Sequence, residues 1–278
     1  MAAFGAIGVA AASGLKRSEA GATRSASSAP RWRRIVVHSL QAVGVTVLPA
    51  MLLDLRPLVA ATRATNAMAG APGVTVTDST TRIELRPTGT ERTTGLVLYS
   101  DALVDPRSYV PILTSLAVAG YPVVILELPF NIAFFDRSGA DAVMSAEPGV
   151  TRWVVGGHSL GGVVASSVAG GADPRLRGLL LRASYPNSSI AAKTLLAVTS
   201  ISGSNDGLAT PAEIDDAKAK LPPDPNYVEI QGGIHSFLGD YGQQDGDGQA
   251  TISREDAQRQ IQSASLALML RVEALSGP

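Results

Sequence analysis

The stretch Trp153–Ser167, WVVGGHSLGGVVASS, decides the fold of this chain. A short apolar run enters a glycine-rich turn, and small and β-branched residues follow at helical spacing. Within it, Gly157–Gly161 has the G-x-S-x-G pattern of a nucleophile elbow, a sharp strand-to-helix turn that exposes a serine. Glycines suit such a turn because its backbone is strained and packs closely against neighbouring strands. The stretch therefore predicts Ser159 as a nucleophile.

The same pentapeptide can arise by chance in a chain rich in glycine and serine. The expected strand before it and helix after it favour the nucleophile instead. The helix that begins beyond Ser159 would also direct backbone amides and the positive end of its dipole at developing negative charge.

Composition limits the classes of function that this chain can have. Its 278 residues are 45% hydrophobic, which is enough for one substantial core in one or two domains. The formal net charge of -1 predicts no basic surface for nucleic acid. The absence of cysteine excludes disulfides, thiol nucleophiles and thiolate metal sites, and it leaves the redox compartment open.

Residues 1–72 have a different composition from the rest of the chain. Residues 1–34 hold many Ala, Ser, Gly and Arg residues and a single acid, which predicts a disordered basic or targeting tail. Residues 35–53 then carry no formal charge and follow the basic cluster Arg31–Arg34. Their length is close to the ~20 residues that cross a bilayer, although His38, Gln41 and Pro49 are costly in lipid.

Residues 35–53 are interpreted first as a hydrophobic helix that serves as a signal anchor. The basic flank would hold the N-terminus in the cytoplasm and place the catalytic domain outside it. The alternatives are a cleaved export signal, an amphipathic helix packed on the body, an organelle transit peptide and a misassigned start codon. Residues 54–72 are expected to form a helical linker into a catalytic domain at residues 73–278.

From residue 73 onward, short β-rich runs alternate with helical patterns. This alternation predicts an α/β fold with a mostly parallel central sheet and helices on both faces. The expected strands are Val74–Thr77 and Arg82–Arg86, which form a hairpin, then Gly95–Tyr99, Val123–Leu128, Val154–Val155, Leu179–Leu181, Leu195–Ser200 and Tyr227–Ile230. The expected helices are Tyr109–Ala119, Gly162–Ala169, Pro211–Lys220 and Arg254–Leu275.

The histidines indicate which residue is the base for Ser159. The chain has three, of which His38 lies in the apolar segment and His158 lies inside the elbow. His235 remains, on a glycine-rich loop directly after an expected strand. A lone histidine is more often structural, but its position after a strand and after a serine elbow favours the catalytic interpretation.

The acid that orients His235 should lie between the two, because the order on this kind of fold is Ser, Asp or Glu, His. Asp206 lies there, on the loop after an expected strand. Asn-Asp-Gly is also ordinary turn chemistry, which is the competing explanation for Asp206. Asp215 and Asp216 fall within an expected helix, and Asp240 follows the histidine.

These residues resemble the α/β-hydrolase superfamily, and further motifs resemble its small bacterial group called α/β-hydrolase fold-5. The motifs are Val104-Asp105-Pro106 followed by Tyr109, then Gly157–Gly162, Asp206–Pro211, Gly232–His235, Phe237–Gly242 and Thr251–Arg254. The resemblance implies a single-domain hydrolase behind an N-terminal hydrophobic helix. It implies a type of reaction and no particular ester.

One turn departs from the pattern of that family. After the third strand the family usually has a Tyr-Pro-Gly-like turn whose backbone N–H completes the oxyanion hole, whereas this chain has Tyr99-Ser100-Asp101-Ala102. The amides of Asp101 or Ala102, together with that of Leu160, are expected to serve instead. A carboxylate that pointed inward would repel the oxyanion, so Asp101 is expected to point outward.

The predicted reaction is cleavage of a small-molecule carboxylic ester, lactone or thioester through an acyl-enzyme, with no metal and no cofactor. The short segment before Leu195–Ser200 predicts little or no cap domain and an open site, which favours short-chain or polar acyl groups. Candidate lining residues are Asn131, Phe134, Phe135, Tyr185, Pro186 and Asn187, for which surface-loop packing is an equal explanation.

Other functions fit the same residues. Acyl transfer to acceptors other than water, lactone opening and perhydrolysis use the same triad. The intact Ser159, Asp206 and His235 count against a membrane-tethered, catalytically silent binding module, but the altered turn at residues 100–102 keeps that alternative open. A peptidase is the third alternative, although the chain shows no sign of the selectivity elements that peptides require. The oligomeric state is left open.

Overall fold

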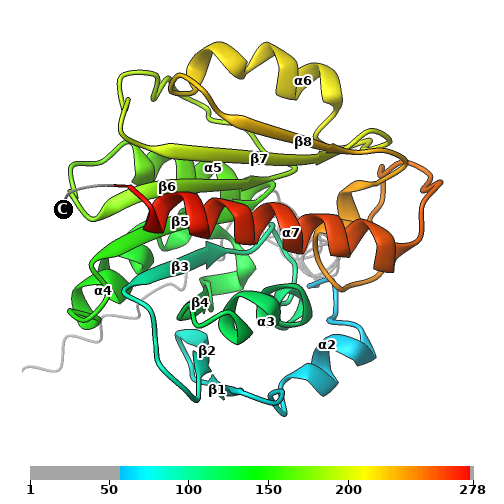
Figure 1. Ribbon diagram of the computed structural model, residues 1–278. Helices are drawn as coiled ribbons and strands as arrows, with labels where there is room; N and C mark the ends of the chain where they lie inside the picture. Colours follow the sequence, from blue (N-terminus) through cyan, green and yellow to red (C-terminus); the bar gives the residue numbers. More distant parts are fainter. Residues whose placement is uncertain (1–56, 276–278) are drawn as a thin grey trace, which may run out of the picture. The chain divides into compact units, whose positions relative to one another are not determined.

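The computed structural model describes residues 57–275, and within them eight strands form one sheet (Figure 1). The strands are β1 (Val74–Asp78), β2 (Arg82–Pro87), β3 (Thr94–Tyr99), β4 (Val123–Leu126), β5 (Arg152–His158), β6 (Leu176–Arg182), β7 (Ala197–Gly203) and β8 (Asn226–Ile230). Their spatial order is β1-β2-β4-β3-β5-β6-β7-β8. β2 pairs antiparallel with β1 and β4, and every other pair is parallel. The predicted hairpin and mostly parallel sheet are confirmed.

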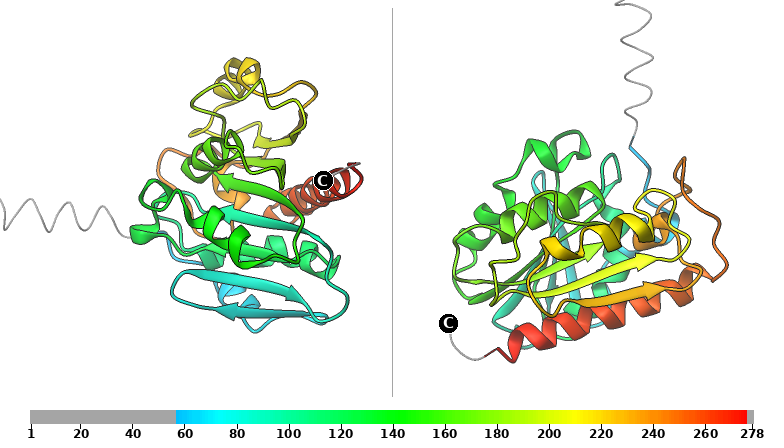
Figure 2. Two further views of the ribbon diagram at one scale, coloured as in Figure 1. Left: turned by 90° about the vertical axis from the view of Figure 1, so that its left-hand side faces the viewer. Right: turned by 90° about the horizontal axis from the view of Figure 1, so that it is seen from above.

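Helices cover both faces of this sheet (Figures 1 and 2). They are α2 (Thr62–Ala67), α3 (Val110–Val118), α4 (Gly139–Ala146), α5 (Leu160–Ala169), α6 (Pro211–Asp216) and α7 (Arg254–Glu273). Short 3₁₀ turns lie at Pro106–Tyr109, Pro129–Asn131, Ala133–Phe135, Lys218–Lys220 and His235–Leu238. Helices α3 and α7 pack on one face, and α4 and α5 pack on the other.

Alternation along β3 shows how the strands supply both cores. Leu96 and Leu98 join the core under α3 and α7, whereas Val97 and Tyr99 join the core under α4 and α5. Successive side chains of a strand point to opposite faces, so a strand buried on both faces needs a continuous apolar run. This explains why β3 is buried at every position.

Part of the segment expected as a linker packs against the catalytic body. Leu58 forms a β-bridge with Val104, Ala60 forms one with Tyr241, and Ala64 of helix α2 is fully buried. Residues 57–72 are therefore integral to this unit, and their first residues lie beside the turn that follows β3. The expectations for residues 1–34, 35–53 and 54–56 fall outside the described residues.

No cap interrupts the sheet between β6 and β7. Residues 183–196, all of which are described, contain no helix or strand. The expectation of little or no cap domain is confirmed. Within residues 57–275, no helix is both long and apolar enough to span a bilayer.

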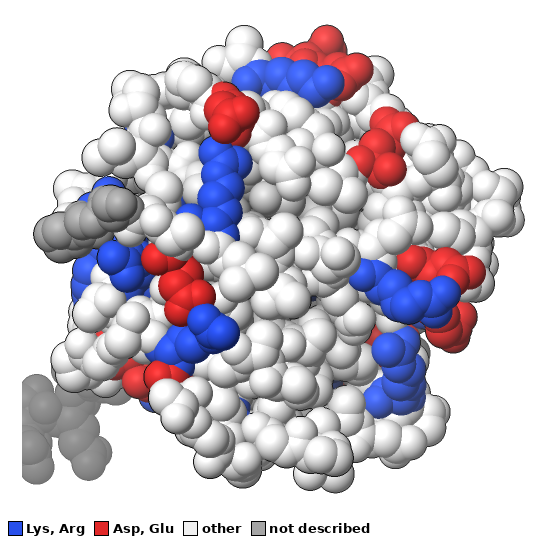
Figure 3. All heavy atoms as spheres, in the orientation of Figure 1, with Lys and Arg blue, Asp and Glu red and all other residues white. Residues whose placement is uncertain are grey.

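Charge is distributed in small groups over the face that Figure 3 shows. Basic side chains there lie mostly beside acidic ones, and uncharged surface separates the groups. This arrangement gives that face no continuous basic track of the kind that binds a nucleic-acid backbone.

Candidate active site

Ser159 occupies the sharp turn between β5 and α5. Its backbone has φ +50° and ψ −120°, a conformation that residues with side chains rarely adopt. Four hydrogen bonds hold the turn. The Ser159 amide donates to the carbonyl of Arg182 at 2.9 Å. The Ser159 carbonyl accepts from the Ser184 hydroxyl at 2.7 Å and from the amides of Gly162, at 2.9 Å, and Val163, at 3.3 Å.

Two glycines allow this turn to close. A Cβ atom on Gly157 would collide with the backbone of Gly161, and one on Gly161 would collide with the carbonyl oxygen of Ser100. Helix α5 therefore packs directly against the turn after β3. This contact brings Asp101 and Ala102 to the nucleophile elbow, because no side chain separates the two backbones.

Asp206 and His235 form a buried pair at the same edge of the sheet. Asp206 follows β7 and His235 follows β8, so both lie beyond the carboxyl ends of parallel strands, as Ser159 does after β5. His235 Nδ1 lies 2.9 Å from Asp206 Oδ2. The other Asp206 oxygen accepts hydrogen bonds from the amides of Leu208 and Ala209, each at 2.8 Å. These contacts fix the carboxylate and leave Nε2, the other ring nitrogen, without a contact to Asp206.

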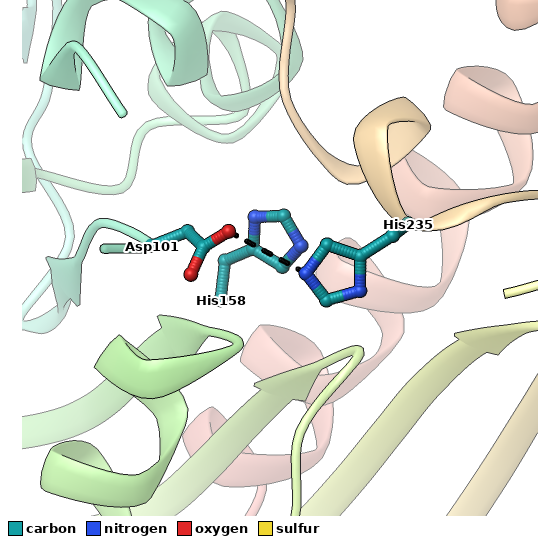
Figure 4. A group of neighbouring side chains, drawn as sticks. All are labelled: Asp101, His158 and His235. Atoms are coloured by element: carbon teal, nitrogen blue, oxygen red, sulfur yellow. Dashed lines mark ion pairs between the residues drawn. The ribbon is translucent and has the colours of Figure 1, made fainter. Parts of the chain in front are cut away.

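Asp101 points inward, which corrects the expectation that it points outward. Only 2% of its surface is exposed, and its Oδ2 atom lies 3.4 Å from His235 Nε2 (Figure 4). The side-chain amide of Gln244, at 3.3 Å, and the backbone amide of Ala102, at 2.6 Å, also donate to this carboxylate. The carboxylate turns inward because a positively charged imidazole and two polar groups replace the water it loses.

The two amides expected to complete an oxyanion hole already have acceptors. The Asp101 N–H donates to the Tyr109 hydroxyl at 3.0 Å, and the Ala102 N–H donates to Asp101 Oδ1 at 2.6 Å. Leu160 begins helix α5, so its N–H has no acceptor within the helix. Of the three expected oxyanion-hole donors, only the Leu160 amide has no hydrogen-bond acceptor in its own helix or turn.

Burial and charge set the protonation of the group. Burial alone would lower the pKa of His235, but Asp101 and Asp206 outweigh it and raise that pKa to about 9. Burial would raise the pKa of Asp101, but His235, His158 and Ser159 hold it below its usual value. At neutral pH the site therefore holds an imidazolium ion between two carboxylates.

His158 is a buried neutral histidine next to His235. Burial, followed by the charge on His235, lowers its pKa to about 3. Its Nδ1 lies 3.0 Å from the Tyr109 hydroxyl, and its ring centroid lies 4.5 Å from that of His235. Because Tyr109 accepts the Asp101 amide, its own proton is assigned to His158 Nδ1, which places the His158 proton on Nε2.

The same three residues form the group with metal-binding potential. One donor atom each from Asp101, His158 and His235 lies within 4.8 Å of the others (Figure 4). A divalent metal would need a free lone pair on both Nε2 atoms. The assigned protons occupy His158 Nε2 and, at neutral pH, His235 Nε2. The donor set in this protonation state therefore does not fit a metal ion.

Sequence reasoning missed the network around the triad candidates. The motif that contains Tyr109 assigns it no role, and the position of His158 next to Ser159 predicts none. Gln244 had no sequence signal at all, since it lies far along the chain from the Asp101 that it contacts.

A cavity of about 360 Å³ lies beside helix α5. Phe134 and Asn187, two of the predicted lining residues, form part of its wall with Val163 and Ser167. Tyr185 is instead directed at Glu213, with its hydroxyl 3.3 Å from that carboxylate. Phe130 and Phe135 are largely exposed and pack edge to face, 6.0 Å apart.

Solved structures share this fold at low sequence identity. A predicted CIB-like hydrolase from Thermoplasma acidophilum has a TM-score of 0.54 and 13% identity, covering 70% of this chain and 100% of that one. A thermostable esterase from Pseudomonas putida has a TM-score of 0.52 and 17% identity, covering 76% and 88%. A membrane phospholipase A described as a bacterial virulence factor has a TM-score of 0.53 and 14% identity, covering 88% and 99%.

The search of curated proteins found no match. The family model of the alpha/beta hydrolases matches residues 95–259, which span β3, the elbow, Asp206, His235 and the start of α7. That range is more than half of the chain and contains every candidate residue of the site. This protein is a member of the alpha/beta hydrolase family.

Proposed function

We propose that this chain is a serine hydrolase that cleaves a small carboxylic ester, lactone or thioester with Ser159, His235 and Asp206. The observation that carries the proposal is the buried 2.9 Å contact between Asp206 and His235 at the sheet edge that also holds the strained Ser159 turn. Family membership supports a hydrolase, and the residue types support acyl transfer to water.

The proposed reaction has two halves. In the first, His235 Nε2 accepts the Ser159 proton as Oγ bonds to the carbonyl carbon, and the carbonyl oxygen becomes an oxyanion. The Leu160 amide stabilises that charge, with a typical value of about 3 kcal/mol for one donor. The carbon–oxygen bond to the leaving group then breaks, and His235 returns the proton to the leaving alkoxide.

In the second half, water replaces the alcohol. His235 takes a proton from water as its oxygen attacks the acyl-serine, and the proton returns to Ser159 Oγ as the acid leaves. Asp206 keeps the proton of His235 on Nδ1 and stabilises the imidazolium in both halves. No step requires a group other than these side chains, the backbone amide and water.

Labelling with a fluorophosphonate tests this proposal directly, because the reagent requires an activated serine. The full chain is compared with Ser159→Ala, His235→Ala and the matched control Ser167→Ala, an exposed serine on the same helix. Labelling of wild type and Ser167→Ala, lost in Ser159→Ala and at least tenfold slower in His235→Ala, supports the triad. Absence of labelling in a protein with a cooperative unfolding transition contradicts it.

A second candidate is a catalytically silent binding module with this fold. It is favoured by the occupied amides of Asp101 and Ala102 and by the Asp101–His235 ion pair. The labelling experiment separates the two candidates. Acyl transfer or perhydrolysis on the same triad is distinguished afterwards, by adding an alcohol or hydrogen peroxide as a competing acceptor and identifying the product.

We further propose that the chain associates with a membrane through residues 35–53, with its catalytic domain outside the cytoplasm. Their uncharged sequence after a basic cluster supports this assignment. So does the exposure of Phe130 and Phe135, at 77% and 64%, on a loop that the Leu103 amide ties to the turn after β3.

Carbonate extraction of cells that express the full chain tests this proposal. The protein should remain in the membrane fraction, and Val45→Arg with Val47→Arg should release it. A soluble wild-type protein with intact residues 35–53 argues against anchoring. A processed protein recovered outside the cell indicates an export signal, and recovery inside an organelle indicates the targeting alternative.

A further inference from the structure

Asp101 differs from the other residues of the site because its carboxylate lies 3.4 Å from Nε2 of His235 and yet has no role in the triad. We propose that Asp101 is a positioning residue that restrains this hydrolase. In the resting site its carboxylate holds Nε2 of His235, and ester cleavage begins only after that contact is released. The inference rests on the proposed triad and concerns the regulation of the same site.

The first support is competition for one atom. His235 Nε2 must accept the Ser159 proton, but Asp101 Oδ2 lies 3.4 Å from it, and no hydrogen bond to Nε2 forms within the described residues. A carboxylate next to Nε2 favours the protonated imidazole, and a protonated Nε2 cannot accept the serine proton.

The second support is that the same side chain closes the oxyanion hole. Asp101 Oδ1 accepts the Ala102 N–H at 2.6 Å, so this amide is unavailable to a substrate oxygen. A negative carboxylate beside that position also opposes the growth of negative charge there. Rotation of this one side chain would therefore free the base and the amide together.

The third support is the fixed position of the backbone around Asp101. Its amide is held by Tyr109, and Gly161 packs against the preceding residue, so the turn itself has little freedom. The second carboxylate oxygen has a weaker anchor, a 3.3 Å contact with Gln244. The simplest way to release His235 is therefore a rotation of the Asp101 side chain while its backbone stays in place.

The groups that face His235 determine how such a restraint responds to pH. They are Asp101 after β3, Asp206 after β7 and His158 at the end of β5, with Tyr109 and Tyr241 packed against His158 and Asp247 bound to the His235 amide. Asp206 is required to orient the ring, and His158 is neutral. Asp101 is therefore the group whose removal should lower the pKa of His235 and keep the ring in place.

The primary test measures that pKa without relying on activity. The full chain contains three histidines, which are followed by NMR titration in wild type, Asp101→Asn, Asp101→Ala and the exposed-loop control Asp245→Asn. The His235 pKa should fall by at least one unit in both Asp101 variants and stay unchanged in Asp245→Asn. An unchanged value in the Asp101 variants overturns the proposal.

The second test measures the restraint as a rate. With p-nitrophenyl acetate, kcat/KM of wild type should rise tenfold per pH unit toward an inflection near pH 9. In Asp101→Asn and Asp101→Ala the inflection of the kcat/KM profile should shift to a pH at least one unit lower. As a result, kcat/KM at pH 7 should increase at least tenfold. Asp245→Asn should match wild type.

The outcomes distinguish this inference from the proposed function. Slower Asp101 variants that still label on Ser159 would show that Asp101 assists the reaction, which overturns the restraint and leaves the triad standing. A lowered His235 pKa with no labelling in any variant would uphold the Asp101–His235 contact and reject the hydrolase. Urea unfolding of each variant identifies a loss of activity that arises from unfolding. Asp101→Asn and Asp101→Ala differ in size, so the test still applies if one of them fails to fold.

Discussion

The Nε2 atom of His235 lies 3.4 Å from a carboxylate oxygen of Asp101, on the side of the ring that a triad directs at its serine. The other ring nitrogen is hydrogen bonded to Asp206. The imidazole therefore lies between two buried carboxylates, one in the position of an orienting acid and one on the nucleophile side. This second contact distinguishes the site from a simple Ser-His-Asp arrangement.

Removing the charge of Asp206 should impair catalysis through His235 without unfolding the protein. Asp206→Asn should lower kcat for ester cleavage by about 10³- to 10⁴-fold, because the amide no longer stabilises the imidazolium and favours the wrong tautomer. Asp216→Asn, an exposed carboxylate on α6, is the matched control and should behave as wild type. Steady-state kinetics on one ester give both values. Equal activity of the two variants would remove Asp206 from the mechanism.

The elbow should tolerate no side chain at Gly161. Gly161→Ala places a methyl group against the Ser100 carbonyl, so we expect a loss of about 2–3 kcal/mol in the free energy of unfolding, together with loss of labelling at Ser159. Gly89→Ala, where a Cβ meets no atom within 4 Å, should change stability by less than about 0.5 kcal/mol. Urea unfolding compares them. Similar stability of the two variants would show that α5 moves away from the turn.

Acid should destabilise the protein through His158. Its pKa is about 3 in the folded protein against 6.5 as the ordinary value, so the folded state resists protonation. Stability from this group is complete above pH 6.5 and is lost as the pH falls toward 3, by at most about 5 kcal/mol. The lowered pKa of Asp101 acts in the same direction.

His158→Gln isolates that contribution. Urea unfolding at several pH values between 4 and 8 should show a shallower decline in the variant than in wild type. Parallel declines would assign the acid sensitivity to other groups.

The contribution of His235 to stability depends on pH in the opposite direction. Its raised pKa gives stability that is complete below pH 6.5 and is lost as the pH rises through about 9. In Asp101→Asn the free energy of unfolding should therefore decline less steeply between pH 6.5 and 9.

Removal of divalent metals should leave the activity unchanged. The proposed steps use only side chains, the backbone and water, and the assigned protons on the two histidines oppose a metal ligand set. Dialysis against EDTA, followed by ester kinetics and metal analysis of the protein, checks this. Lost activity that returns with added zinc would instead assign Asp101, His158 and His235 to a metal site.

Most of the fold was predictable because it depends on local patterns. The expected strands fall within or overlap the observed ones, and the hairpin of β1 and β2 matches its predicted position. The final helix was expected at Arg254–Leu275 and spans Arg254–Glu273, starting after a Ser253 side chain that accepts the Asp256 amide. Helix α4 was missed, since its eight residues include Gly139 and offer too short a pattern to identify.

Local sequence patterns were sufficient to predict the elbow, the order of Ser159, Asp206 and His235, and the sheet whose strand ends carry them. These follow from glycine spacing and hydrophobic periodicity, which act within a few residues. Only the tertiary structure decided where the Asp101 carboxylate points. Its partners far along the chain are His235 and Gln244, both between β8 and α7, so its direction depends on charges and donors brought together by folding. The sequence predicted that a carboxylate would repel an oxyanion, but the ion pair with His235 outweighs that expectation in the resting site.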